Sequence, residues 1–313
     1  MRTRFRGLTT REGMIITGEA GVGEFSPFWD YDDAESAPWL RAAHEAAHHG
    51  WPTPVRERVP VNVTIPAVDP QRAHELVKAS GGCRTAKVKV AETGETLDQE
   101  LDRVAAVRDA LGSGGRIRVD ANGAWDVETA ISHLNALDRA AGGLEYAEQP
   151  CATVAELAHV RRRVKVPIAA DESIRRAADP LEVARQEAAD IIVVKVQPLG
   201  GVRQALTIIE EVGLPAVVSS ALESSVGIAA GVALAAALPT LEHACGLATV
   251  NLFHDDTVVA PFKPTHGALP VVAAQEVRLR HDMESCAADQ ATQRRWQERL
   301  YRVGRLVDES GHE

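Results

Sequence analysis

Five charged residues recur near the ends of successive strand-like runs, and their spacing constrains the fold more than any other feature of the chain. They are Lys89, Asp120, Glu148, Asp171 and Lys195, and consecutive members lie 23 to 31 residues apart. That interval is about one strand plus one helix. Because the strands of a closed parallel barrel all end on one rim, we expect the five charges to converge there. Three carboxylates between two ammonium groups suit the binding of a divalent metal ion and the transfer of a proton.

Strand-like and helical runs alternate along the chain from Val61 onward. The pattern predicts eight strands and seven helices, with the last two strands at Pro215–Ser220 and near Ala244–Val250. The predicted helices are 70–80, 97–111, 127–141, 154–164, 180–188, 202–212 and 225–238. Such alternation is typical of a parallel sheet covered by helices, and eight repeats favour a closed barrel over an open sheet.

The segments on either side of this region have different patterns. Residues 1–57 contain short strand-like segments, an acidic-aromatic loop around Phe28, Trp29 and Tyr31, and an Ala-rich helix. Residues 254–313 contain loops, short strands and a charged helix near Asp289–Val303. We expect the two terminal segments to pack together beside a barrel formed by residues 58–253. The aromatic loop either belongs to the core of this smaller domain or closes over a substrate.

Composition and charge argue against several classes of protein. A net charge of −10 and a pI of about 5.6 disfavour nucleic acid as a partner. The four cysteines are scattered without a C-x-x-C pair, which indicates a reducing compartment. The first residues lack the apolar core of a signal peptide, and no apolar run approaches about 18 residues. We therefore expect a cytoplasmic protein with no membrane contact, and no obligate protein partner is evident.

Lys89 and Lys195 lie within β-branched runs, where an unpaired lysine is costly. One interpretation is that each lysine is the salt-bridge partner of a neighbouring carboxylate. The other is that they face a substrate from opposite sides, with pKa values lowered by burial and a nearby cation, as suits a general base. Lys87 lies two residues before Lys89 and points to the same face of the strand. Acidic residues after strands also cap helices, but three in register with two lysines favour a metal site.

Motifs around these charges resemble those of the enolase superfamily, and in particular its muconate-lactonising-type subgroup. They are K-V-K (87–89), V-D-A-N-G-A-W (119–125), E-Y-A-E-Q-P (145–150), A-D-E-S (170–173) and V-V-K-V-Q-P-L-G-G (193–201). The resemblance covers nearly the whole chain. It implies an α/β fold: a modified TIM barrel, (β/α)7β, with an α+β capping domain formed by both termini.

The resemblance also implies a role for each matching residue. Asp120, Glu148 and Asp171 resemble the ligands of a Mg²⁺ ion, which Mn²⁺ could replace, and Lys89 and Lys195 resemble an acid/base pair. The residues that resemble those orienting the ligands are Lys87, Asn122, Gln149 and Glu172. The shared step is removal of a proton α to a carboxylate, giving an enediolate that the metal ion stabilises. A small-molecule carboxylate is therefore the expected substrate.

Features outside the five motifs favour one branch of this subgroup. The compact length, the short cap and the run S-S-A-L-E-S-S-V-G (219–227) resemble a carbon–oxygen lyase that forms 2-succinylbenzoate in menaquinone biosynthesis. The run H-A-C-G-L-A-T (243–249) lacks the D-x-D expected of a dipeptide epimerase. A racemase of N-succinylamino acids is the alternative, because two lysines on opposite sides of one carbon also suit that reaction. Ser219, Ser220 and Gly246 are predicted substrate contacts by position.

The string His44-Glu45-Ala46-Ala47-His48 matches H-E-x-x-H, the helix of zinc peptidases. An Ala-rich helix with polar residues produces this string easily, and the sequence offers no convincing third ligand. We therefore predict a solvated helix face here and not a zinc site.

Overall fold

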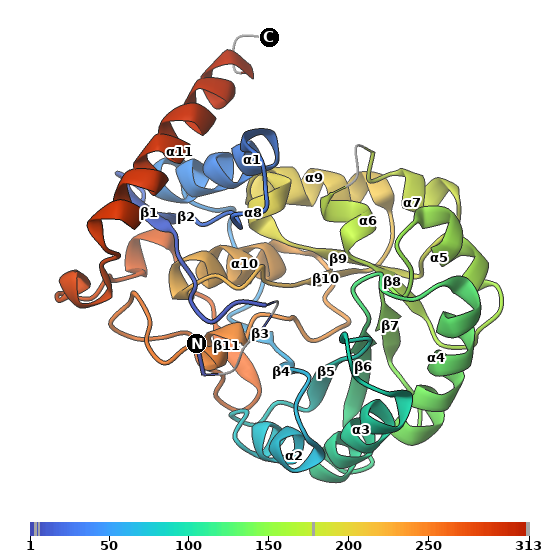
Figure 1. Ribbon diagram of the computed structural model, residues 1–313. Coiled ribbons are helices and arrows are strands. Elements are labelled where there is room, and N and C mark those ends of the chain that lie inside the picture. The colour runs from blue at the N-terminus through green and yellow to red at the C-terminus, as the bar shows by residue number, and fades with distance from the viewer. Residues whose placement is uncertain (3–4, 6, 177–178, 311–313) are drawn as a thin grey trace.

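The computed structural model describes residues 1–2, 5, 7–176 and 179–310, and the centre of the described structure is a parallel sheet of seven strands (Figure 1). The strands run in chain order across the sheet, as the alternating pattern predicts. They are β4 (Val63–Ile65), β5 (Thr85–Lys89), β6 (Arg116–Asp120), β7 (Tyr146–Glu148), β8 (Ile168–Ala170), β9 (Ile191–Val194) and β10 (Ala216–Val218). Most of their residues are buried on both faces, as expected of a sheet enclosed by helices.

A two-residue segment closes the sheet where an eighth strand was predicted. Cys245 bridges Val61 beside β4, and Gly246 bridges Ser219 after β10, both in the parallel sense. Backbone hydrogen bonds of 2.7 to 3.0 Å hold the two residues between the edges of the sheet. The pairing stops there because the chain then turns into a 3₁₀ helix, η2 (Thr249–Leu252). The prediction of a full strand in this region was therefore wrong, although the segment takes the place of one.

Helices follow the strands at nearly all of the predicted positions. They are α2 (Pro70–Lys78), α3 (Leu97–Leu111), α4 (Val127–Ala141), α5 (Val154–Arg161), α7 (Glu182–Arg185), α9 (Val202–Val212) and α10 (Ser225–Ala237). Asp69, Thr96 and Asp126 begin three of them, each side chain accepting a hydrogen bond from a backbone N–H of the first turn. The helix predicted at 180–188 is only the single turn α7. Two further single turns were not predicted, α6 (Glu172–Arg175) and α8 (Val196–Leu199).

The two termini form a capping domain beside the barrel. The hairpin β1 (Met14–Thr17) and β2 (Val22–Phe25) leads to α1 (Asp33–His44) and a π-helical turn, η1 (Glu45–His49). The C-terminal helix α11 (Gln290–Ser310) packs along α1 and then projects from the body of the molecule (Figure 1). The buried Arg299 of α11 donates to the backbone carbonyls of Phe28 (2.9 Å) and Tyr31 (2.6 Å). The predicted contact between the tail and the N-terminal segment is thus confirmed.

The remaining elements connect barrel and tail. Strand β3 (Arg58–Pro60) pairs antiparallel with β11 (Ala268–Pro270), and two 3₁₀ turns follow, η3 (Ala274–Glu276) and η4 (Met283–Cys286). The division into 1–57, 58–253 and 254–313 stays a proposal. Within the described residues, no helix has the length and apolarity needed to span a membrane.

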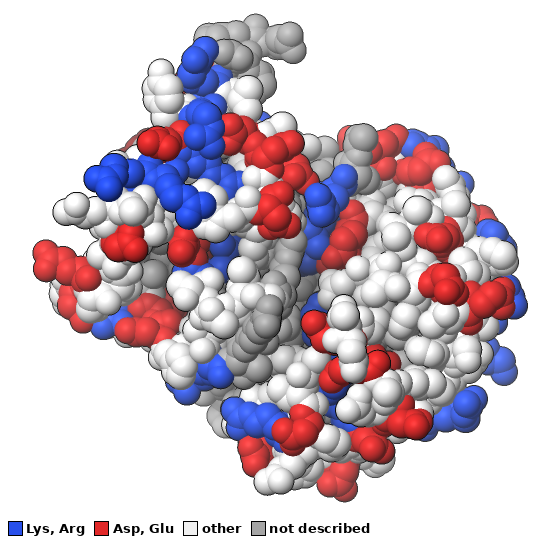
Figure 2. Space-filling view, in the orientation of Figure 1, with Lys and Arg blue, Asp and Glu red and all other residues white. Residues whose placement is uncertain are grey.

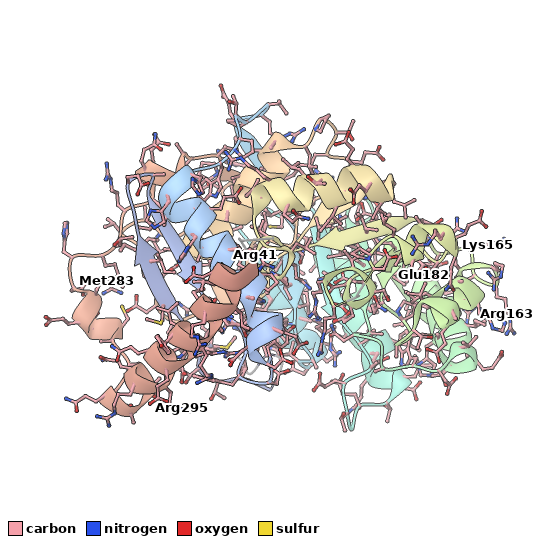
Figure 3. All side chains as sticks on the ribbon, turned by 90° about the horizontal axis from the view of Figure 1, so that it is seen from above. Arg41, Arg163, Lys165, Glu182, Met283 and Arg295 are labelled. Atoms are coloured by element: carbon pink, nitrogen blue, oxygen red, sulfur yellow. The ribbon has the colours of Figure 1, made fainter. Side chains whose placement is uncertain are left out.

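The surface is charged and mixed in sign. Figure 2 shows acidic and basic side chains interspersed over the visible face, with basic ones concentrated along α11. In the view from above, Arg163 and Lys165 lie at the edge of the barrel far from α11 (Figure 3). Arg163 pairs there with the exposed Glu128. Exposed pairs of this kind contribute little to stability, and we assign this basic run no function.

Candidate active site

The predicted site residues come together at the carboxyl ends of the barrel strands. Lys89, Asp120 and Glu148 are the last residues of β5, β6 and β7. Asp171 and Lys195 directly follow β8 and β9. Lys89 stands opposite Asp120 in the sheet register, and Asp120 stands opposite Glu148. The spacing of the charges along the chain therefore brings them to one rim.

A cavity of about 650 Å³ opens over this rim. Barrel strands and the loops that follow them provide most of its wall, and the N-terminal segment contributes Phe5 and Phe28. The predicted site residues that line it are Lys87, Lys89, Asp120, Asn122, Asp171, Glu172, Lys195, Ser219, Ser220 and Gly246. Glu148 is only 1 % exposed and lies beneath them.

Each lysine on the rim is paired with a carboxylate. Lys87 Nζ lies 2.6 Å from Glu148 Oε1 and 3.2 Å from Asp120 Oδ2. Lys89 Nζ lies 2.5 Å from Asp120 Oδ2, and Lys195 donates to Asp171 Oδ2. The two interpretations of the lysines are therefore compatible, because the same ammonium groups form salt bridges and face the cavity.

Burial and neighbouring charge shift the pKa values of these groups in different directions. Burial disfavours the charged form of Asp120, but the ammonium groups of Lys89 and Lys87 outweigh it and hold its pKa well below the usual range. Burial, reinforced by the charge of Asp120, raises the pKa of Glu148 to about 7. Burial also lowers the pKa of Lys195, although Asp171 opposes this effect. A lysine with a lowered pKa is better suited to proton transfer near neutral pH.

The carboxylates are chemically suited to a hard divalent cation. Asp120, Glu148 and Asp171 offer only oxygen atoms, which Mg²⁺ and similar ions prefer. Glu148 Oε2 is buried and has no hydrogen-bond partner among the described residues, so a cation could satisfy it. Among all the described residues, no three Asp, Glu, His or Cys side chains are clustered tightly enough to bind a metal ion in their present positions. Lys87 lies between two of the carboxylates, and a metal ion would compete with its ammonium group for the same oxygens.

The residues predicted to orient the ligands lie close to them. Asn122 accepts a hydrogen bond from Lys89 Nζ (2.7 Å) and donates from its backbone N–H to Asp120 Oδ1 (3.1 Å). Gln149 Oε1 accepts from the backbone N–H groups of Asp171 (2.9 Å) and Ser173 (3.2 Å). Gln149 therefore fixes the backbone at Asp171 and not its carboxylate. The orienting roles themselves stay a prediction.

Sequence reasoning missed the arginine that joins barrel and cap at the cavity. Arg175 of α6 lies 3.1 Å from Asp171 Oδ1, 2.5 Å from Glu172 Oε1 and 2.6 Å from the hydroxyl of Tyr31. The spacing of Asp171 and Arg175 is that of neighbours on one helical face, but no helix was predicted there. Phe28 and Tyr31 are both buried, and Phe28 also lines the cavity. Phe28 and Tyr31 thus belong to the cap core, with Phe28 also part of the cavity wall, whereas Trp29 of the same loop is 40 % exposed.

The residues predicted to contact the substrate lie together where the sheet closes. Ser219 and Gly246 form one bridge of the closure, and a Cβ atom on Gly246 would clash with the Ser219 side chain. The hydroxyl of Ser220 lies 2.7 Å from that of Thr249. Only glycine fits at 246 without movement of Ser219, while contact with a substrate stays a prediction.

A buried pair of carboxylates supports the loop that follows β10. Glu24 of β2 accepts from the backbone N–H groups of Ser224 (3.1 Å) and Gly227 (3.1 Å), at the start of α10. Glu223 accepts from the backbone N–H of Ala221, which lines the cavity. Burial, reinforced by the charge of Glu24, raises the pKa of Glu223 from its ordinary 4.5 to about 7.

Replacing Glu223 with glutamine is expected to stabilise the protein at alkaline pH. A raised folded-state pKa means that folding retains a proton between pH 4.5 and about 7, so wild-type stability falls as pH rises through that range. Glutamine keeps the acceptor without the charge, and the gain should reach roughly 3 kcal/mol above pH 7 and vanish below pH 4.5. Denaturant unfolding of both proteins across this range measures it. A gain that does not depend on pH would contradict the explanation.

The H-E-x-x-H string is not arranged for zinc. The carboxylate of Glu45 accepts from the backbone N–H groups of Val202 and Arg203, at the start of α9, and its side chain is 11 % exposed. His48 bonds instead to Glu19 (2.6 Å). Our prediction of a solvated helix face was wrong for Glu45, because that side chain packs against the barrel.

Family models and relatives agree with this architecture. A model described as enolase C-terminal domain-like matches residues 70–275, and one described as enolase N-terminal domain-like matches residues 1–47. An o-succinylbenzoate synthase of Thermobifida fusca is 63% identical over 89% of this chain and 88% of its own length. The enzyme of the same name from Mycolicibacterium smegmatis is 52% identical over 98% of this chain and 94% of its own length.

Solved structures share the fold at lower identity. Muconate lactonizing enzyme from Pseudomonas putida matches with a TM-score of 0.72 at 21% identity, over 85% of this chain and 89% of its own. A dipeptide epimerase from Enterococcus faecalis, complexed with Mg and a dipeptide, matches with a TM-score of 0.62 at 29% identity, over 72% and 64%. The chain belongs to the enolase superfamily, in the part of its muconate-lactonising subgroup that contains the o-succinylbenzoate synthases.

Proposed function

We propose that the protein catalyses the o-succinylbenzoate synthase reaction. In this reaction 2-succinyl-6-hydroxy-2,4-cyclohexadiene-1-carboxylate loses water and becomes 2-succinylbenzoate, a step of menaquinone biosynthesis. The observation that carries the proposal is the pair Lys89 and Lys195, which face one cavity from β5 and β9 across three carboxylate-bearing strands. Relatives that carry this name match nearly the whole chain at 52% to 63% identity.

A divalent metal ion is the expected cofactor, as in other members of the superfamily, and we propose Mg²⁺. Asp120, Glu148 and Asp171 would hold it, and the Mg in the Enterococcus faecalis epimerase structure supports this choice. When bound, the ion supplies positive charge that stabilises the substrate carboxylate as negative charge develops on it. The ammonium group of Lys195, which faces the cavity, would also stabilise the negative charge of the substrate carboxylate.

The two lysines would divide the proton chemistry between them. A neutral Lys89 takes the proton from the carbon that bears the carboxylate, and the electron pair of that C–H bond moves into the developing enediolate. The same proton then passes to the departing hydroxyl group, which leaves as water while the ring becomes aromatic. Lys195 would remain cationic and stabilise the enediolate from the other side. Because burial lowers the pKa of Lys195, single variants of each lysine are needed to separate the roles.

The cap would keep water from the reacting carbon. Phe28 forms part of the cavity wall, and Arg175 joins the barrel rim to Tyr31 of the cap. An aromatic side chain in the wall and a cap bonded to the barrel rim would reduce competition from solvent and strengthen electrostatic interactions in the cavity.

Purified protein with Mg²⁺ is expected to convert the cyclohexadiene substrate to the aromatic product. The loss of diene absorbance measures this conversion. Chelation of divalent ions should reduce turnover to background, and added Mg²⁺ should restore it, because the ion would supply positive charge that stabilises the substrate carboxylate as negative charge develops on it. Absence of turnover with Mg²⁺ present would sink the proposal.

A racemase of N-succinylamino acids uses the same placement of lysines and is the main alternative. Incubation of such substrates in deuterated water distinguishes it, because racemisation exchanges the α-proton and removes optical activity. Racemisation without any conversion of the cyclohexadiene would replace our proposal with this one. A cytoplasmic location stays a prediction from the sequence.

A further inference from the structure

Arg103 of α3 lies outside the cavity but contacts the backbone of a residue that lines it. Its guanidinium group donates through Nε to the carbonyl of Val68 (2.7 Å) and through Nη1 to the carbonyl of Lys89 (2.8 Å). Nη2 forms an ion pair with Glu95. Arg103 is 1 % exposed, so its guanidinium group lies away from water, whereas its partner Glu95 is 20 % exposed. One side chain thus joins the segments that follow β4 and β5.

A second residue of α3, Glu100, lies one helical turn before Arg103 and binds the backbone just after Lys89. Glu100 accepts a hydrogen bond from the backbone N–H of Ala91 (2.5 Å) and is itself buried. Ala91 has a φ of 62°, a left-handed conformation that is strained for a residue other than glycine. Strained backbone persists where its surroundings hold it. Arg103 and Glu100 therefore fix the chain at both sides of the turn that follows Lys89.

Fixing this turn matters because a lysine side chain is long and flexible. The position that Lys89 Nζ can reach depends on where its backbone begins. Hydrogen bonds from a charged donor to a buried acceptor are among the stronger ones in proteins, so the two that Arg103 donates to carbonyls favour one backbone position. Lys89 is the most exposed of the three lysines, since its side chain is 16 % exposed whereas those of Lys87 and Lys195 are 8 % exposed.

We propose that Arg103 is a positioning residue for the proton transfer by Lys89. By binding the Lys89 carbonyl, the Val68 carbonyl and Glu95 together, it sets the end of β5 and so directs the ammonium group into the cavity. The inference rests on the proposed role of Lys89 as proton carrier. It adds a residue from the outer helix layer, which lines no part of the cavity.

Arg108 provides a matched control on the same helix. It also donates to three backbone carbonyls, those of Ala141 (2.6 Å), Gly112 (2.8 Å) and Gly115 (2.7 Å). None of these residues lines the described cavity. Replacing either arginine with lysine keeps the charge but removes the fork that reaches several acceptors at once.

The Arg103→Lys variant is expected to lower kcat by about 10²-fold while KM changes little, because a displacement of about 1 Å at a reacting group has an effect of this size. Mg²⁺ affinity, measured by the metal-dependent shift in melting temperature, should stay unchanged, since the carboxylates keep their places. Both variants should lower the melting temperature, because each loses hydrogen bonds to backbone carbonyls, but Arg108→Lys should leave kcat unaltered. The proposal would be overturned if both variants lost kcat equally, or if neither variant lost any.

Amide hydrogen exchange tests the positioning without any turnover. Residues 90–95 should exchange faster in Arg103→Lys than in wild type, and Arg108→Lys should leave them unchanged. If wild type fails to convert the cyclohexadiene, the proposed function fails, but exchange in this segment still decides whether Arg103 holds it. Unchanged exchange in Arg103→Lys contradicts the inference whatever the activity.

If Arg103→Lys does not fold, the variant Glu95→Gln provides a second test of the positioning role of Arg103. Glu95 is partly exposed, and its loss weakens only the outer contact of Arg103. We expect a smaller fall in kcat with KM unchanged and faster exchange in residues 90–95. A variant with wild-type kcat and exchange would refute the positioning role.

Discussion

Lys89→Ala is expected to lower kcat by about 10²–10⁴-fold, the range that general acid–base catalysis contributes. The variant removes the group proposed to take the α-proton and to return it to the leaving hydroxyl. Asp120 would not be left as an unpaired buried charge, because Lys87 Nζ lies 3.2 Å from the same oxygen. The fold should therefore persist, which circular dichroism and a melting curve can establish before kinetics are measured.

Lys89→Arg is the matched control for charge. Arginine preserves a cation beside Asp120 but stays protonated at any working pH, so it cannot accept a proton. If Lys89 acts as a proton carrier, this variant should be as inactive as Lys89→Ala. Substantial turnover by Lys89→Arg would show that only the charge is needed. Unfolding of Lys89→Ala would instead favour the purely structural salt bridge.

Lys87→Met is expected to reduce the free energy of unfolding of the metal-free protein by about 3–5 kcal/mol, as found when one partner of a buried ion pair is removed. Lys87 lies against both Glu148 and Asp120, and methionine fills a similar volume without charge. The two carboxylates would then face each other without the ammonium group between them, although Lys89 still pairs with Asp120. Denaturant unfolding in the presence of a chelator measures the loss.

Added Mg²⁺ should stabilise Lys87→Met more than it stabilises wild type. In wild type the ion must displace the Lys87 ammonium from oxygens that it shares, whereas the variant offers them unpaired. A ligand that binds only the folded state adds RT ln(1 + [L]/Kd), about 2.7 kcal/mol at 100 times Kd. Lys78→Met is a suitable control, since Lys78 donates to the carbonyl of Ala110 and does not line the described cavity. An equal Mg²⁺ effect in all three proteins would contradict the competition.

The arrangement of the rim could be predicted because it depends on local pattern and topology alone. A charge at the end of each buried strand, repeated once per strand and helix, places Lys89 to Lys195 on one edge of any parallel barrel. The motifs then distinguish carboxylates from lysines. Their burial follows from the same pattern, since each lies in a run of β-branched or small residues.

Contacts between segments far apart in sequence could not be predicted in this way. Arg175 meets Tyr31, and Glu45 caps α9, because the cap docks on the barrel at one particular angle. Nothing in the local sequence specifies that angle. In the sequence Arg103 has no feature that sets it apart from other helix residues, and only the packing of α3 on β5 shows that it reaches the Lys89 carbonyl. The eighth strand is reduced to Cys245 and Gly246 because the chain then turns into η2, and the sequence alone did not show where that turn begins.

The closure at Cys245 and Gly246 has a consequence for how the chain is made. On the ribosome β4 emerges early, but the residues that cover its free edge follow only after almost the whole barrel has been synthesised. At 5–20 residues per second the delay is on the order of tens of seconds. During that time the nascent chain exposes an unpaired parallel edge, a surface prone to pairing with other chains. Chaperone binding during synthesis would therefore be expected to end when the segment around Gly246 leaves the exit tunnel.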